Sequence, residues 1–337
     1  MTKPLPKRVP RPFGQYLLLD RIGIGGMAEV WRAKMFGGEG QGRLVAVKRI
    51  LPHLADTDEF VSMFLDEGRI SLQLLHENIA QTYEVGQIGP HAFLTVEFIA
   101  GKPLSVLFAR GRKLAQPVPM RLACYCIAKA CEGLDYAHRK KDGRGKDMNI
   151  VHRGLSLDDV LVSYAGEVKV IDFGIAQAAG RVTKTEPGVI KGKFGYMSPE
   201  QIDSMPLDRR SDVFTMGVCL YELLTGQRLF QGENDFDSLD MVRKGKVVPP
   251  SKHNREIPSE LEQVVLKALS LDVGDRHRYA SELAEELRRF YSLSDSTLGA
   301  QELRQYMSTA FAEDIQREAL RQQEEAALEP PKDFDEY

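Results

Sequence analysis

The distribution of apolar residues divides this chain into a β-rich first part and a helical remainder. From about Tyr16 to Val106, short apolar runs alternate with glycine-rich turns, a pattern typical of strands. The runs are QYLLLDRIG, AEVWRAKMF, GRLVAVKRI, AQTYEVGQI and HAFLTVEFI. One helical pattern, DEFVSMFLDEGRISLQLL, interrupts them. We therefore predict an α+β fold that begins with a small β lobe carrying one helix.

Helices dominate after Pro117. The apolar periodicity predicts helices over residues 119–139, 210–225, 259–271 and 280–292, with a strand-like interlude, DVLVSYAGEVKVID, between the first two. A β-rich lobe followed by a helical lobe predicts a cleft between them, where ligands commonly bind.

Both ends of the chain differ in composition from this body. Residues 1–15 hold four prolines among basic residues, which predicts a disordered arm. Over residues 297–328, apolar side chains recur at three-and-four spacing, which predicts an amphipathic tail helix: Leu303, Tyr306, Met307, Ala310 and Phe311. The tail must dock on the main body or on a protein partner. Residues 329–337 are acidic and proline-broken, so we expect disorder there.

Charge and cysteine usage exclude several classes of function. A net charge of −3, from 45 basic and 48 acidic residues, gives no broad attraction to nucleic acid or to an anionic membrane. The four cysteines show no spacing typical of zinc ligands or of a disulfide framework, so we expect buried thiols in a reducing cytosol: Cys124, Cys126, Cys131 and Cys219. Neither a signal peptide nor a run of ~18 apolar residues is present. We expect a cytoplasmic location.

A glycine-rich turn near the start is the first feature with chemical meaning. The segment RIGIGGMAEVWRA places Gly23, Gly25 and Gly26 between two strands and Val30 after them. Glycines in such a turn let backbone N–H groups approach phosphate oxygens closely. Glycine is equally common in hairpin turns for purely conformational reasons. The turn alone therefore does not distinguish a phosphate-binding loop from an ordinary hairpin.

The strand that follows ends in the run VAVK, where Lys48 is a lone cation in apolar surroundings. A buried ammonium is costly unless it is paired. We therefore expect a phosphate and a carboxylate beside it, and Glu67 on the intervening helix is the candidate carboxylate. A lysine that reaches from a strand end to solvent would be the alternative if Lys48 stood alone.

Further motifs follow in order: IVHRGLSLDDVLV, GEVKVIDFG, KGKFGYMSPEQ, RRSDVFTMGVCLYELLTG and DVGDRHR. With these, the chain from about Tyr16 to Tyr291 resembles the eukaryotic-like serine/threonine protein kinases, particularly those of bacteria. The resemblance implies a bilobal protein-kinase fold over residues 16–293, with an N-lobe over 16–99 and a C-lobe over 104–293. It also implies ATP and Mg²⁺ as cofactors and a protein partner or substrate.

The same resemblance implies a set of nucleotide-binding positions: Ile22, Gly23, Gly25, Val30, Ala46, Lys48, Glu97, Ile99 and Asp172. Within it, Lys48 and Glu67 match the ion pair that positions the phosphates. Residues 97–99 match the hinge whose backbone would bind adenine. Asp172, in the Asp-Phe-Gly triplet, matches a magnesium-binding aspartate.

Other matches are structural. Glu200 is expected to pair with Arg276, and Asp212 is expected to anchor the backbone of the His-Arg-Gly turn. His152 and Phe173 are expected to stack in an apolar column.

Two positions of the family's HRDxxxxN motif depart from the pattern. Gly154 stands where the catalytic aspartate would be, and glycine has no side chain to accept a proton. Asp159 stands where an asparagine would hold a second magnesium ion, and a carboxylate also suits that metal. Using Asp158 instead would require a rearranged loop.

The substrate side of the motif set also departs from the pattern. Lys193 replaces a threonine common in serine/threonine kinases, and Ser156 replaces a lysine. Thr183 and Thr185 are candidate phosphorylation sites that Arg153 could pair with, although exposed loop threonines are common.

Three hypotheses follow from these residues. The first is a pseudokinase that binds ATP and regulates or scaffolds a partner in signalling. The second is an active or weakly active serine/threonine kinase with an atypical site. The third is a deliberately inactivated form of an active kinase, against which stand the further departures at Asp159 and Lys193.

Overall fold

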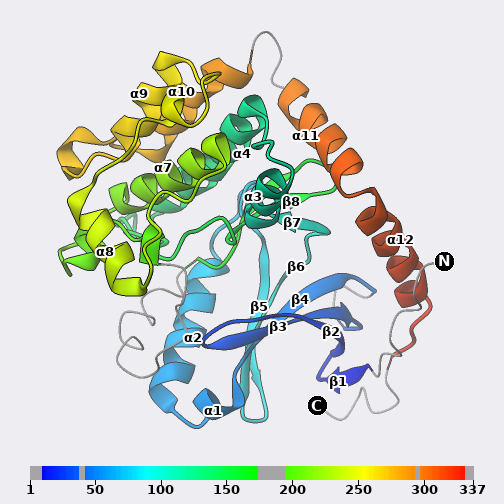
Figure 1. The fold of residues 1–337 in the computed structure, drawn as a ribbon. Coiled ribbons are helices and arrows are strands. Elements are labelled where there is room, and N and C mark those ends of the chain that lie inside the picture. Colours follow the sequence, from blue (N-terminus) through cyan, green and yellow to red (C-terminus); the bar gives the residue numbers. More distant parts are fainter. Residues whose placement is uncertain (1–9, 38–41, 174–193, 293–296, 331–337) are drawn as a thin grey trace. The chain divides into compact units, whose positions relative to one another are not determined.

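The strands of the first hundred residues form a six-stranded antiparallel sheet in the computed structural model, which describes residues 10–37, 42–173, 194–292 and 297–330 (Figure 1). The strands are β1 (Arg11–Phe13), β2 (Tyr16–Ile24), β3 (Ala28–Met35), β4 (Leu44–Ile50), β5 (Thr82–Ile88) and β6 (His91–Glu97), in the order β1-β2-β3-β4-β6-β5. The five predicted strands are thus confirmed.

The chain divides into two compact units. The first unit holds this sheet and consists of the chain up to Gln73, Gln81–Phe98 and the chain from Glu313 onward. The second unit consists of Leu74–Ala80 and Ile99–Ala312.

The two faces of the six-stranded sheet bury different clusters. One face carries an apolar cluster that includes Tyr16, Val47 and Phe93. The other face is covered at one end by α1 (Pro52–Ala55) and α2 (Asp58–Ser71). A Cβ atom added at Gly68 would lie 2.7 Å from a methyl group of Val85, so glycine lets α2 approach the sheet closely.

β1 corrects the expectation of a disordered arm over residues 1–15. Residues 11–13 pair with β2, and Phe13 is buried with its ring centroid 5.5 Å from that of Phe93. Aromatic burial therefore fixes this segment. Pro12 is tolerated because β1 lies at the edge of the sheet, where a missing N–H breaks no central ladder.

The second unit is mainly helical. Its helices are α3 (Leu104–Lys113), α4 (Met120–His138), α6 (Pro199–Ile202), α7 (Arg210–Thr225), α8 (Asp235–Lys244), α9 (Ser259–Ala268), α10 (Ala280–Tyr291) and α11 (Thr297–Ala310). Three short 3₁₀ turns lie at Phe194–Tyr196, Pro250–Lys252 and Val273–Asp275. A small sheet joins β7 (Gly101–Pro103), β8 (Val160–Ser163) and β9 (Val168–Val170).

Helices α4 and α7 form the centre of the second unit. Every residue of α7 from Ser211 to Thr225 is buried, as expected for a helix that is apolar on all sides. The helix ends at Gly226, whose φ of 68° is the left-handed conformation that glycine adopts without a steric penalty. None of the described helices combines the length and apolarity needed to cross a membrane.

The tail forms two helices instead of the single helix predicted over residues 297–328. Phe311 interrupts them, and α12 (Ala312–Ala326) follows. In α11, Leu303 and Met307 are fully buried, and Glu302 pairs with Arg121 at 3.2 Å. The apolar face of α11 therefore packs on the chain's own helical unit.

The buried cysteines lead to a test of the second unit's core. All four are buried and free, and burial raises the pKa of the Cys124 thiol to about 12 and that of Cys219 well above its ordinary value. Because the thiolate is the reactive species, we expect Ellman's reagent to label no cysteine in the native protein and four in denaturant. Rapid labelling of a native thiol would contradict this packing.

Candidate functional site

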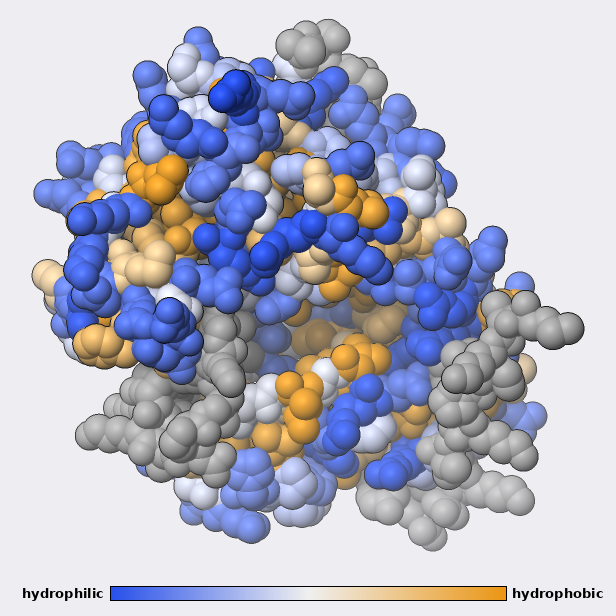
Figure 2. Space-filling view, viewed as in Figure 1, coloured by the Kyte–Doolittle hydropathy of each residue, from blue (hydrophilic) through white to orange (hydrophobic). Residues whose placement is uncertain are grey.

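The glycine-rich turn joins β2 to β3 in the first unit. The N–H of Gly25 donates to the carbonyl of Ala28 at 2.8 Å, which closes the turn, and Gly23 pairs with Val30 across the two strands. Ile22 and Ile24 expose half or more of their surface, and Figure 2 shows apolar side chains over this pair of strands. The turn is therefore a hairpin with an open apolar flank.

Val30, Ala46 and Lys48 lie on one face of the sheet. Lys48 is directly opposite Val30 on β3 and Leu94 on β6, and Ala46 is opposite Val96. Residues directly opposite in antiparallel strands share a face, as do residues two apart on one strand. The sheet thus places a cation beside a small apolar surface.

Lys48 and Glu67 form the predicted ion pair. The Lys48 Nζ lies 3.9 Å from the Glu67 Oε1, and both side chains are less than a tenth exposed. Pairing the two charges offsets part of the cost of burying them.

Glu97 is the last residue of β6 and forms two hydrogen bonds with Gln81. The Glu97 N–H donates to the Gln81 carbonyl at 2.7 Å, and the Glu97 carboxylate accepts from the Gln81 N–H at 3.1 Å. A backbone carbonyl has two lone pairs, so the Glu97 carbonyl can accept from a ligand. Ile99, the other predicted hinge residue, belongs to the second unit.

The backbone of the turn that carries Gly154 is fixed by hydrogen bonds to two side chains, those of Asp212 and Gln201. Asp212 accepts from the N–H groups of His152 at 2.8 Å and Arg153 at 3.0 Å, as predicted. The Arg153 carbonyl accepts from the Gln201 side chain at 2.6 Å. Between them, the Gly154 N–H donates to the His152 carbonyl at 2.8 Å, which closes a γ-turn centred on Arg153.

Strained backbone marks this region. Arg153 and Asp172 have φ values of 64° and 61°, whereas Gly154 is not among the described glycines with positive φ. Non-glycine residues in the left-handed region cost of order 1–3 kcal/mol and concentrate at functional sites. The φ value at position 154 therefore does not itself require glycine.

Asp212 is a fully buried carboxylate. Burial alone would raise its pKa, but the hydrogen bond and charge of His138, together with the charge and backbone N–H of His152, hold the pKa below its ordinary value. The His138 Nε2 lies 2.7 Å from the Asp212 Oδ2. Asp212 is thus a structural anion committed to the turn.

Asp159 is oriented by Ser156, whose contact with it was not predicted from the sequence. The buried Ser156 hydroxyl donates to the Asp159 Oδ2 at 2.6 Å, and the Asp159 carbonyl accepts from the Ile171 N–H at 2.9 Å. The second contact places Asp159 beside the chain that leads into Asp172. Ser156 gave no sequence signal beyond its place in the motif, because a lysine is more usual there.

The Asp158 side chain forms a hydrogen bond with α3. Its side chain is exposed and accepts a short hydrogen bond from the hydroxyl of Ser105 in α3. To serve in place of a residue at position 154, it would have to leave this partner.

His152 also contacts the Asp-Phe-Gly segment. Its Nε2 lies 2.8 Å from the Ile171 carbonyl, and its ring centroid lies 4.9 Å from that of Phe173. The predicted stacking of His152 with Phe173 is present within the second unit. Gly174, Thr183, Thr185 and Lys193 lie outside the described residues.

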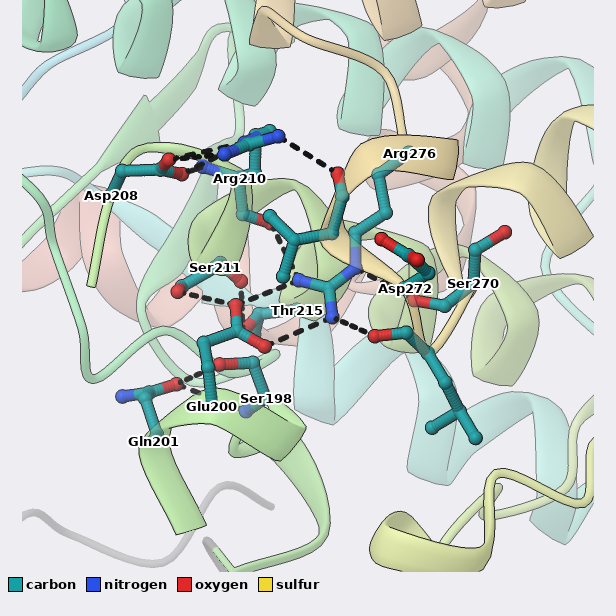
Figure 3. A network of polar contacts seen from close by, with 12 residues as sticks. Ser198, Glu200, Gln201, Asp208, Arg210, Ser211, Thr215, Ser270, Asp272 and Arg276 are labelled. Atoms are coloured by element: carbon teal, nitrogen blue, oxygen red, sulfur yellow. Dashed lines mark hydrogen bonds and ion pairs between the residues drawn. The ribbon is translucent and has the colours of Figure 1, made fainter. Parts of the chain in front are cut away.

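Glu200 and Arg276 form the predicted buried pair (Figure 3). The two guanidinium nitrogens donate to the two carboxylate oxygens at 2.7 and 2.9 Å, and the Ser211 hydroxyl adds a third hydrogen bond at 2.6 Å. Burial opposes ionisation of Glu200, but Arg276 and Ser211 outweigh it and lower its pKa. This network joins α6, α7 and the segment before α10.

Comparison with known proteins identifies the chain's family. A family model for the protein kinase domain matches residues 16–287. The chain belongs to the protein kinase family. The kinase domain's β-rich first unit and helical second unit are those of the bilobal protein-kinase fold, as predicted.

Bacterial kinases are among the most similar relatives of this kinase domain. Tyrosine-protein kinase MasK of Myxococcus xanthus is 38% identical over 304 residues, which is 90% of this chain and 47% of MasK. Serine/threonine-protein kinase PknB of Mycobacterium leprae is 32% identical over 289 residues, which is 84% of this chain and 44% of PknB. The chain thus spans less than half the length of these relatives.

Solved structures show the same fold. The kinase domain of PknI from Mycobacterium tuberculosis superimposes with a TM-score of 0.62 at 20% identity, covering 83% of this chain and 97% of that one. At this identity the likeness concerns the fold alone.

Proposed function

We propose that this kinase-family chain is a pseudokinase that binds ATP and regulates or scaffolds a protein partner in signalling. The observation that carries the proposal is a contrast between two parts of the site. The Lys48–Glu67 pair is formed and the sequence retains carboxylates at Asp159 and Asp172, whereas the turn held by Asp212 carries no side chain at Gly154.

The first unit fits a nucleotide. Lys48 would hold phosphate oxygens, with Glu67 keeping its ammonium in place. Val30 and Ala46, on the same face, would cover the adenine ring, and the Glu97 carbonyl would accept a hydrogen bond from it.

The second unit fits Mg²⁺ held partly by phosphate. No cluster of three or more histidine, cysteine, aspartate or glutamate side chains suited to a metal occurs in the part of the chain that the structure describes. Mg²⁺ commonly binds one or two carboxylates together with substrate phosphates. Asp172 and the Ser156-oriented Asp159 would supply those carboxylates. The ion would neutralise phosphate charge.

The substrate hydroxyl has no general base at position 154. Each neighbouring carboxylate already has a partner, since Asp158 accepts from Ser105, Asp159 from Ser156, and Asp212 from the backbone. A positioned general base typically contributes about 10²–10⁴-fold to a rate. Phosphotransfer would therefore be slow or absent.

An active or weakly active protein kinase is the second candidate. The names of the relatives favour it, because MasK and PknB are described as kinases. Positioning and electrostatic stabilisation supply most phosphoryl-transfer catalysis, so transfer of the ATP γ-phosphate to a protein hydroxyl can outlast the loss of the base. Serine or threonine would be the acceptor, although MasK is described as a tyrosine-protein kinase.

The proposed use of ATP and the four free thiols both fit a cytoplasmic location.

Replacing Lys48 with methionine tests the nucleotide site. We expect a fluorescent ATP analogue to bind the unmodified chain in a saturable manner and the Lys48→Met variant at least about tenfold more weakly, because hydrogen bonds to charged groups contribute roughly 1.5–3 kcal/mol. Lys113→Met, at an exposed lysine at the end of α3, is the control and should bind normally. The proposed nucleotide site would be refuted by equal affinity in all three proteins.

A further inference from the structure

Arg32 on β3 is a buried cation that is bound by two glutamates of α12. Its guanidinium donates to the Glu325 carboxylate at 2.6 and 3.0 Å and to the Glu318 carboxylate at 2.8 Å. Arg32 is 1% exposed and Glu325 is 3% exposed. Removing the carboxylates from such a group leaves an unpaired buried charge. The docking of α12 and the burial of Arg32 are therefore linked.

Lys34, two residues along β3, binds the end of the same helix. Its Nζ donates to the carbonyls of Glu325 at 2.8 Å, Ala326 at 3.0 Å and Leu328 at 2.9 Å. The last carbonyls of a helix lack partners within it, and a cation there also meets the negative end of the helix dipole. Lys34 thus fixes the position at which α12 ends.

Apolar contacts extend this attachment. Leu328, just beyond α12, packs against a cluster that includes Leu17, Phe36 and Leu44. The exposed side of α12 is mostly hydrophilic in Figure 2, although Leu320 is exposed there too. Helix α12 is consequently an element of the first unit.

The docking position lies on the face that carries the candidate nucleotide residues. Arg32 is opposite Ala46, and Lys34 is opposite Leu44, so both share a face with Val30. At one end this face is covered by α2 and at the other by the end of α12 (Figure 1). On this face, Val30 and Ala46 lie between the two helices.

Arg32 also contacts the segment that would bind adenine. Its guanidinium carbon lies 4.4 Å from the centroid of the Phe98 ring, within the range of a cation–π contact. Phe98 directly follows Glu97, whose carbonyl would accept from adenine. A continuous series of contacts therefore runs from Glu318 and Glu325 through Arg32 to Phe98.

We propose that Glu318 and Glu325 are positioning residues for adenine, acting through Arg32 and Phe98. The inference rests on the proposed ATP binding. With both carboxylates neutralised, Arg32 lacks a counter-charge while it is buried, so it would leave Phe98 for solvent and α12 would undock. The segment that ends β6 then loses the contact that fixes its backbone.

The test compares two doubly substituted full-length chains. Glu318→Gln/Glu325→Gln removes the two carboxylates that bind Arg32, and Glu313→Gln/Glu324→Gln removes two exposed ones from the same helix. Calorimetric titration with adenosine and with Mg-ATP should show the first variant binding both ligands about fivefold or more weakly, the low end of coupling between sites. The control should match the unmodified chain.

A second variant guards against simple misfolding. Arg32→Lys keeps a cation for both carboxylates but lacks the planar guanidinium that stacks on Phe98 and binds two oxygens at once. It should also weaken adenosine binding. Hydrogen exchange of the backbone amides of residues 94–98 should be faster in both variants, with cooperative thermal unfolding retained.

The outcomes separate the two proposals. Failure of the unmodified chain to bind adenosine and ATP would overturn the proposed function and this inference with it. Normal adenosine affinity and normal amide exchange in Glu318→Gln/Glu325→Gln would overturn this inference alone. A loss seen for ATP but not for adenosine would also overturn it, because the effect would then concern the phosphates.

Discussion

Replacing Gly154 with aspartate is expected to raise phosphotransfer by about 10²–10⁴-fold, the usual contribution of a positioned general base. The turn is ready for the side chain, because Asp212 holds the N–H groups of His152 and Arg153 and Gln201 holds the Arg153 carbonyl. Gly154 is not among the positive-φ glycines of the described residues. The φ value at position 154 therefore does not itself oppose an aspartate.

The measurement is incorporation of labelled phosphate from ATP into the protein and into a generic protein substrate. Gly154→Asn is the matched control, because asparagine has nearly the shape of aspartate but cannot accept the proton as a base. Lys48→Met in the Gly154→Asp background should abolish the gain. A Gly154→Asp protein no more active than Gly154→Asn would show that the missing base is not the limiting lesion.

Replacing Arg276 with methionine is expected to destabilise the chain by about 3–5 kcal/mol, the usual cost of removing one partner of a buried ion pair. Glu200 would remain buried without its guanidinium partner, keeping the Ser211 hydroxyl and a backbone hydrogen bond. The free energy of unfolding, measured by urea denaturation, should fall by this amount. Arg278→Met, at an exposed arginine two residues away, should change it by less than about 1 kcal/mol.

Two further measurements separate the ion pair from ordinary packing. Arg276 keeps the pKa of Glu200 low, so the pair's contribution is present above the ordinary glutamate pKa, about 4.3, and is lost as pH falls through the lowered value. The deficit of Arg276→Met should therefore shrink in acid. Adding Glu200→Leu to Arg276→Met should restore part of the stability. A deficit independent of pH would contradict this explanation.

Most of the fold was predictable because it rests on local patterns and ordered motifs. Alternating apolar runs marked β2 to β6, and helical periodicity marked α4, α7, α9 and α10. The prediction was wrong for β1, because two prolines beside Phe13 indicate an arm unless the burial of Phe13 against Phe93 is known. It also missed the break at Phe311, since the apolar spacing continues through that residue.

The site was predictable only where the family motif names residues. Lys48, Glu67, Asp212 and the Glu200–Arg276 pair lie where the resemblance placed them. The hydrogen bond from Ser156 to Asp159 and the contacts from Arg32 to the tail were not foreseen. Arg32 and Glu325 are 293 residues apart, and no periodicity or spacing rule pairs charges across such a separation.

The central claim is that ATP binds while phosphotransfer fails. It is tested most directly by measuring both on one preparation, with Mg-ATP binding followed by titration and labelled phosphate followed in the same buffer. We predict saturable, metal-dependent binding and no incorporation above that of Lys48→Met. Incorporation by the unmodified chain that Lys48→Met abolishes would contradict the claim and establish an active kinase.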